Sequence, residues 1–143
     1  MHLSSYNYSL AGTGAHTLQL TGSANINATG NNLGDNISGN AGNNTLIGGS
    51  GNDTITAGSG SDTLTGGGGT DTFVFNVSTG TDVITDFSGH DVINISAYLK
   101  AGYTPTVTDV GANTMLSFSN GSSIELLGVH SASLISTSVG YTH

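Results

Sequence analysis

The sequence predicts an all-β protein, a right-handed parallel β-solenoid (β-roll) of about 18 residues per turn with an antiparallel β-rich C-terminal cap. A nine-residue pattern repeats five times between residues 30 and 74, and this is the main observation behind the prediction. Glycine makes up 23 of the 143 residues, and only 7% of the residues are charged. Such a chain cannot bury a large conventional core, so its stability must come from stacked turns.

Each nine-residue unit divides into a turn and a short strand. The best copies are 48–56, Gly-Gly-Ser-Gly-Asn-Asp-Thr-Ile-Thr, and 66–74, Gly-Gly-Gly-Gly-Thr-Asp-Thr-Phe-Val; unit 57–65 lies between them, and looser copies begin at Gly30 and Gly39. The glycine-rich half favours a turn, because glycine reaches positive φ and lets backbones approach closely. The x-apolar-x half predicts a strand with one inward side chain, and successive units alternate between two sheets.

This alternation predicts two facing columns of apolar side chains. Ile37, Ile55 and Phe73 should stack in one sheet. Leu46 and Leu64 should stack in the other sheet and face them across the core.

The repeat also places an acid or an amide every nine residues, two positions before the apolar residue. Asp35, Asp53 and Asp71 should form a column on one edge, with Asn44 and Asp62 on the opposite edge. Neighbours in a column lie roughly 4.8 Å apart, where two carboxylates repel by about 1 kcal/mol in water. A hard dication removes this cost, and carboxylate plus carbonyl oxygens suit Ca²⁺ better than Mg²⁺. A metal-free solenoid with amide ladders in place of the ions is the alternative.

The repeat resembles that of the RTX family of type I-secreted bacterial proteins, in which calcium lies between turns. The resemblance implies about two to four Ca²⁺ ions, held by Asp53 with Asp71, by Asp35 with Asp53, and by Asn44 with Asp62. Carbonyl oxygens of the glycine loops complete the implied shells, through Gly49, Gly51, Gly58, Gly60, Gly67 and Gly69. Two sites depart from the family pattern. Leu33 replaces a glycine in the loop of Asp35, and Asn44 offers only a neutral oxygen to the site that it shares with Asp62.

The flanking segments are expected to belong to the same structural domain. Residues 1–29 are expected to form capping strands and a degenerate repeat. The degenerate repeat spans residues 21–29, with Ala28 at the apolar position and no acid. That unit should stack without binding metal, and the asparagine-rich first turns are candidates for metal-free turns. Residues 75–143 are expected to form the cap, with a hairpin whose Asn120-Gly121 dipeptide is typical of a type I′ turn.

The stretch 81–87 resembles the closing motif of RTX modules in serralysin-type proteases and alginate epimerases. The resemblance implies that Asp82 and Asp86 help to hold a terminal calcium ion. The alternative is that both are solvated residues on a half-buried strand. The tail, within 75–143, is similar to a type I secretion segment, which implies export to the extracellular space.

Composition excludes several classes of function. The net charge of −8 with a single Lys or Arg, Lys100, opposes binding to nucleic acid or anionic membrane. The absence of cysteine excludes disulfides and thiolate metal sites. No signal peptide or membrane-spanning stretch is visible, and a monomer is expected. We find no catalytic residue: the five histidines are scattered, and His90, near Asp86 and Asp91, is best interpreted as a surface turn residue.

Two functions are compatible with these patterns. The first is a non-catalytic module of a larger secreted protein, which folds on calcium outside the cell and supports secretion and folding of an upstream enzyme or adhesin. The second is a calcium-dependent polysaccharide-binding module, for which Tyr6, Tyr8, Tyr98 and Tyr103 are candidate stacking platforms.

Overall fold

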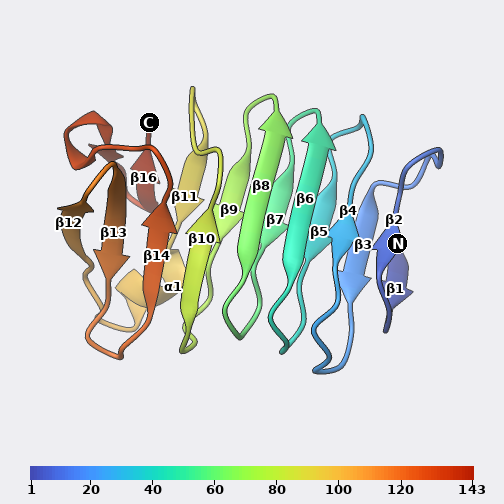
Figure 1. The fold of residues 1–143 in the computed structure, drawn as a ribbon, viewed down its shortest axis with the longest axis horizontal. Helices are drawn as coiled ribbons and strands as arrows, with labels where there is room; N and C mark the ends of the chain where they lie inside the picture. The colour runs from blue at the N-terminus through green and yellow to red at the C-terminus, as the bar shows by residue number, and fades with distance from the viewer.

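The computed structural model describes residues 1–143 as two eight-stranded sheets. The first sheet contains, in spatial order, β1 (His2–Ser4), β3 (Thr17–Leu20), β5 (Asn36–Ser38), β7 (Thr54–Thr56), β9 (Thr72–Val74), β11 (Val92–Asn94), β16 (Gly140–Thr142) and β15 (Ile135–Ser136). The second contains β12 (Thr106–Val110), β13 (Asn113–Ser117), β14 (Ser123–Leu126), β10 (Thr81–Ile84), β8 (Thr63–Gly68), β6 (Thr45–Ser50), β4 (Ala28–Thr29) and β2 (Tyr8–Ser9). Figure 1 shows the strands stacked along the long axis, which confirms the predicted parallel solenoid.

The predicted apolar columns form the centre of the core. Ile37 lies beside Ile55, and Ile55 beside Phe73, in the parallel register of the first sheet. Leu46 lies beside Leu64 in the second sheet. All five side chains are fully buried. The degenerate unit also stacks as predicted, since its Ala28 lies beside Leu46.

The parallel roll extends beyond residues 30–74 in both directions. At the N-terminal end, β1 pairs with β3 and β2 with β4 in parallel. At the other end, β10 pairs with β8 and β11 with β9 in parallel. The segments 80–84 and 89–93 retain the Gly-x-Asp-x-apolar half of the repeat. Two additional residues after Val74 lengthen this turn, so that equivalent residues are 20 rather than 18 positions apart.

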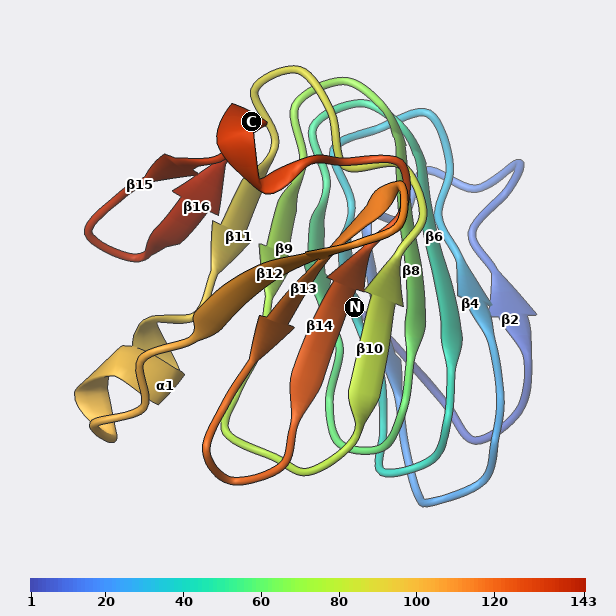
Figure 2. The ribbon, with the colours of Figure 1, turned by 60° about the vertical axis from the view of Figure 1, so that its left-hand side comes forward.

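An antiparallel cap closes the C-terminal end, as predicted. Strands β12, β13 and β14 extend the second sheet, and the β15–β16 hairpin extends the first. The short helices α1 (Ser96–Lys100) and η1 (Ser131–Ser133) belong to the same end of the molecule (Figure 2). The predicted type I′ turn at Asn120-Gly121 is wrong: only Gly121 has positive φ, and the N–H of Phe118 donates to the Ser122 carbonyl, which makes a longer loop. No helix of the structure is long and apolar enough to span a bilayer.

Replacing Gly67 by alanine is expected to destabilise the roll by about 1–3 kcal/mol. Gly67 has a φ of 97°, and a Cβ at this position would collide with the Gly49 carbonyl oxygen of the neighbouring turn. Gly68 is the matched control, because it lacks positive φ and a Cβ there has open space. Urea unfolding in calcium compares the two variants. Equal stability of Gly67→Ala and Gly68→Ala would contradict the assigned backbone constraint.

Candidate metal-binding edges

The loops that connect the two sheets stack along two edges of the roll. The first edge carries loops 10–16, 30–35, 48–53, 66–71 and 86–91. The second edge carries loops 21–26, 39–44, 57–62 and 75–81. Each nonapeptide loop ends on its acid or amide, so these side chains are brought into two columns.

On the first edge, hydrogen bonds tie each aspartate to the next turn. The N–H of Asp35 donates to Oδ1 of Asp53 (2.7 Å), and the N–H of Asp53 donates to Oδ1 of Asp71 (2.9 Å). The N–H of Asp71 in turn donates to Oδ1 of Asp91 (2.8 Å). All four residues are buried. Asp91 was not among the predicted ligands, although Gly89-His90-Asp91 preserves the end of the repeat loop and is the signal that could have identified it.

The second edge has the same arrangement with one amide. The N–H of Asn44 donates to Oδ1 of Asp62 (2.7 Å), and the N–H of Asp62 donates to Oδ1 of Asp82 (2.8 Å). Asp82 is only 7% exposed, so it is not the solvated strand residue of the alternative interpretation. The structure therefore places Asp82 at the end of this column.

Several buried carboxylate oxygens in these columns have no partner. They are Oδ2 of Asp53, Asp62 and Asp71, and Oδ1 of Asp35. The Oδ2 atoms of Asp53 and Asp71 lie against the first glycine of their own loops, where a side chain would collide with them. A buried charged oxygen without a partner is costly. A cation bound at the loop removes that cost.

The electrostatics of the columns also favour a cation. Burial raises the pKa of Asp62 to about 7, with repulsion from Asp82 as a smaller cause. Burial likewise raises the pKa of Asp53 to about 6, aided by the charges of Asp71 and Asp35. The pKa of Asp82 is raised by burial to about 6, and that of Asp71 is also raised by burial. The charged forms of these groups are therefore unfavourable in the folded chain without an ion.

We expect the calcium-free chain to lose stability as the pH rises. The folded-state pKa values of Asp53, Asp62 and Asp82 lie above the ordinary aspartate value of 3.8, so the folded state binds more protons than the unfolded state between pH 3.8 and about 7. Unfolding free energy then falls as pH increases through that range. Far-UV circular dichroism in EDTA at pH 5 and pH 8 measures the folded fraction, and Asp62→Asn should flatten its dependence on pH. A folded fraction in EDTA that increases with pH would contradict the expectation.

The glycine loops supply backbone oxygens beside the acid columns. All six predicted glycines have positive φ: Gly49, Gly51, Gly58, Gly60, Gly67 and Gly69. The carbonyl oxygens of Gly49 and Gly51 point at the following loop, where a Cβ on Gly67 or Gly69 would meet them. No group of three or more His, Cys, Asp or Glu side chains converges on one point. An ion at these edges must therefore combine one or two carboxylates with carbonyl groups, which is a donor set that suits calcium.

Two of the predicted ligands are already engaged by protein groups. Both oxygens of Asp86 accept backbone N–H groups, from Gly66 at 2.9 Å and from Gly67 at 2.8 Å. In regular turns the first N–H of the loop donates to a strand carbonyl, as Gly30 does to Ile47. Asp86 thus replaces a strand carbonyl where the turn is lengthened.

Asn44 is fully hydrogen-bonded as well. Its amide oxygen accepts the N–H of Asn40 (2.9 Å), and its amide nitrogen donates to the Ile26 carbonyl (2.7 Å) and to Oδ1 of Asn40 (2.9 Å). Asn44 therefore has no side-chain oxygen without a partner, whereas Asp53, Asp62 and Asp71 each have one.

The tyrosines considered as glycan platforms differ in their exposure to solvent. Tyr98 cannot serve as a glycan platform, because it is buried, stacks on Phe118 and donates to Oγ of Ser122. Tyr6 is exposed, and Tyr8 and Tyr103 are half-buried. His90 lies on the surface, as expected.

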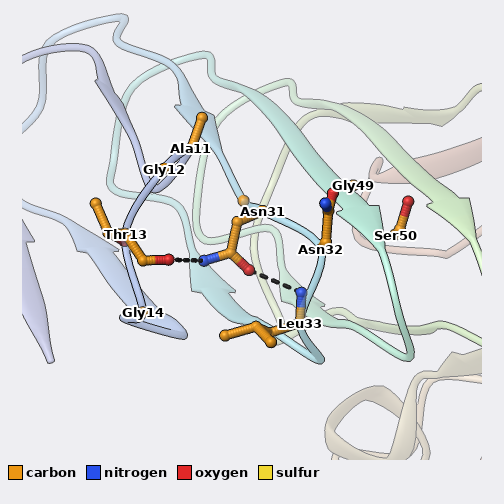
Figure 3. A pocket seen from close by; sticks show the side chains of 10 residues that line it. Ala11, Gly12, Thr13, Gly14, Asn31, Asn32, Leu33, Gly49 and Ser50 are labelled. Carbon is orange, nitrogen blue, oxygen red and sulfur yellow. Dashed lines mark hydrogen bonds between the residues drawn. The ribbon is translucent and has the colours of Figure 1, made fainter.

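The surface has three hollows, and none of them is lined by Asp, Glu, His or Lys. The largest is a groove of about 550 Å³ between loops 11–14 and 30–33 (Figure 3).

Comparison with known proteins identifies the repeat segment. A family model described as the RTX calcium-binding nonapeptide repeat, in four copies, matches residues 29–64 and 38–73. These ranges contain the loops whose aspartate oxygens lack partners. No curated protein matches the chain. RTX repeats bind calcium and are typical of secreted bacterial proteins.

Proposed function

We propose that the chain is a module that folds on calcium binding outside the cell, because residues 29–73 match the RTX calcium-binding nonapeptide repeat. The observation that carries the proposal is the set of unpartnered, buried oxygens on Asp53, Asp62 and Asp71. Each belongs to a loop with glycine at its second position, 48–53, 57–62 or 66–71.

The proposed ions lie between turns, beside those three aspartates. On the first edge the next turn contributes Asp71 to the loop of Asp53, and Asp91 to the loop of Asp71. On the second edge Asp82 joins Asp62. The loop carbonyls around Gly49, Gly58 and Gly67 complete the shells. Asp35, with one oxygen bonded to the Asn31 N–H and the other free, is a candidate for one more ion with Asp53.

The proposed switch follows from the energetics of the columns. Without calcium, buried carboxylates one strand spacing apart repel and are desolvated, which opposes closure of the roll. Calcium is scarce inside cells and abundant outside, so the module stays unfolded for type I secretion and closes after export. Folding then supports an attached enzyme or adhesin, because binding free energy becomes folding free energy.

Isothermal titration calorimetry of the full chain tests the binding step. We expect about two to four calcium equivalents and a much weaker response to magnesium, which prefers a tighter octahedral shell. Absence of calcium binding would overturn the proposal.

A polysaccharide-binding role is the second proposal, and the exposed Tyr6 beside Tyr8 supports it. Their rings lie 6.3 Å apart in an edge-to-face arrangement, and Tyr8 also stacks on His2 at 3.8 Å. Exposed aromatic rings are suitable surfaces for neutral sugars. Glycan arrays probed in calcium and in EDTA test it, with Tyr6→Ala as the variant. Binding that is absent under both conditions would remove this role.

A further inference from the structure

Side-chain amides bridge the first gap between turns on each edge. On the first edge the amide nitrogen of Asn31 donates to the carbonyl oxygens of Ala15 (2.7 Å) and Thr13 (3.3 Å), as Figure 3 shows for Thr13. On the second edge the amide nitrogen of Asn40 donates to the carbonyl oxygens of Thr21 and Ala24, both at 3.0 Å. Each amide thus joins its own loop to carbonyls of the preceding turn.

Both asparagines occupy the second position of a nonapeptide loop. Glycine occupies that position in the later loops, as Gly49, Gly58 and Gly67, with φ between 93° and 119°. Neither Asn31 nor Asn40 has positive φ. This difference in backbone conformation decides where the N–H of the second residue points.

In the asparagine loops that N–H satisfies the residue at the acid position. The N–H of Asn31 donates to Oδ2 of Asp35 (2.6 Å), and the N–H of Asn40 donates to Oδ1 of Asn44 (2.9 Å). In the glycine loops no such bond forms, and the equivalent oxygens of Asp53, Asp62 and Asp71 are left without a partner. The second residue of a loop therefore determines whether its backbone N–H bonds the side-chain oxygen that faces it or leaves that oxygen for a cation.

We infer that Asn31 and Asn40 take the place of calcium in the N-terminal turns, where their amide N–H groups bind the loop carbonyls. The second edge is the clearer case, because Asn44 adds a further amide donor to the Ile26 carbonyl and carries no charge to neutralise. Amides hold loops 30–35 and 39–44 to the turns that precede them, and the proposed ions lie in the gaps between later turns. This inference rests on the proposed function, since it assigns which turns of the roll use calcium.

Converting the second-edge loop to the consensus tests the inference. The double variant Asn40→Gly with Asn44→Asp gives the loop the sequence Gly-Gly-Ala-Gly-Asn-Asp, and we expect it to bind one more equivalent of calcium than the natural chain. Asn43→Asp is the control, because it adds the same charge to the same loop but leaves the amides of Asn40 and Asn44 in place. Equilibrium dialysis with calcium alone measures the stoichiometry of all three proteins.

An unchanged stoichiometry in the double variant, with calcium bound by the natural chain, would overturn the inference and leave the proposed function standing. No calcium bound by any of the proteins would overturn the proposed function.

The single variant Asn40→Ala keeps the inference falsifiable if the double variant fails to fold. It leaves two carbonyls without donors, and we expect the melting temperature in calcium to fall by roughly 5 °C with unchanged calcium stoichiometry. Loss of a calcium equivalent in this variant would show that Asn40 belongs to an ion site and would overturn the inference.

Discussion

Replacing Asp71 by asparagine is expected to remove at least one calcium equivalent and to raise the calcium concentration needed for folding by roughly tenfold. Asp71 lies in the middle of its column, bonded through Oδ1 to the N–H of Asp53 and through its own N–H to Asp91. Its carboxylate therefore borders two gaps between turns. Asparagine keeps an oxygen for the Asp53 N–H, so the variant removes charge with little change of shape.

The same variant should behave in the opposite way without calcium. Burial raises the pKa of Asp71, so its charge opposes folding in EDTA, and the neutral amide removes that cost. Asp71→Asn is thus expected to be at least as stable as the natural chain in EDTA. Glu125→Gln is the control, since it removes one charge from the cap and keeps an acceptor for the amide of Asn113. If both variants shift the calcium midpoint equally, net charge rather than a specific ligand explains the effect.

Phe73→Ala is expected to lower the unfolding free energy of the calcium-loaded protein by about 3–5 kcal/mol. Phe73 is fully buried and lies between Ile55 and Ile93 in the first sheet. Its ring also meets Phe87 edge-on, with centroids 6.4 Å apart. Truncation leaves a cavity between the two sheets that the regular turns cannot close.

Urea unfolding in calcium measures this loss, with Val74→Ala as the control. Val74 belongs to the same strand but points outward and is half-buried, so its truncation should cost much less. Comparable losses for the two variants would show that the inward column does not dominate the stability of the roll.

The nine-residue period was sufficient to predict the roll, because it fixes which side chains share a column. Ile37, Ile55 and Phe73 are stacked as their spacing requires. The continuation of the roll to β11 was harder to predict, because two additional residues after Val74 break the period and the first glycines of both later units are lost. The strands that follow Gly80-Thr81-Asp82 and Gly89-His90-Asp91 nevertheless continue the parallel pairing of the roll.

The division of the edges into two kinds of loop could not be predicted from the acid positions. The repeat pattern marks residues such as Asp35 and Asn44, but it does not show the hydrogen bonds of the residue four positions earlier. Asn31 and Asn40 act through amide contacts to carbonyls of the preceding turn, which depend on the stacking of loops distant in sequence. Asp86 was predicted as a ligand from its place in the 81–87 motif, and the sequence could not show its bonds to the Gly66 and Gly67 N–H groups, which arise only in the folded roll.

Far-UV circular dichroism during a calcium titration of the full chain, started in EDTA and repeated with magnesium, tests the central claim most directly. The account predicts a cooperative gain of β-structure that is selective for calcium, because only a large, oxygen-binding dication suits the unpartnered aspartates of the loops. A chain that is fully folded in EDTA and indifferent to calcium would contradict the account.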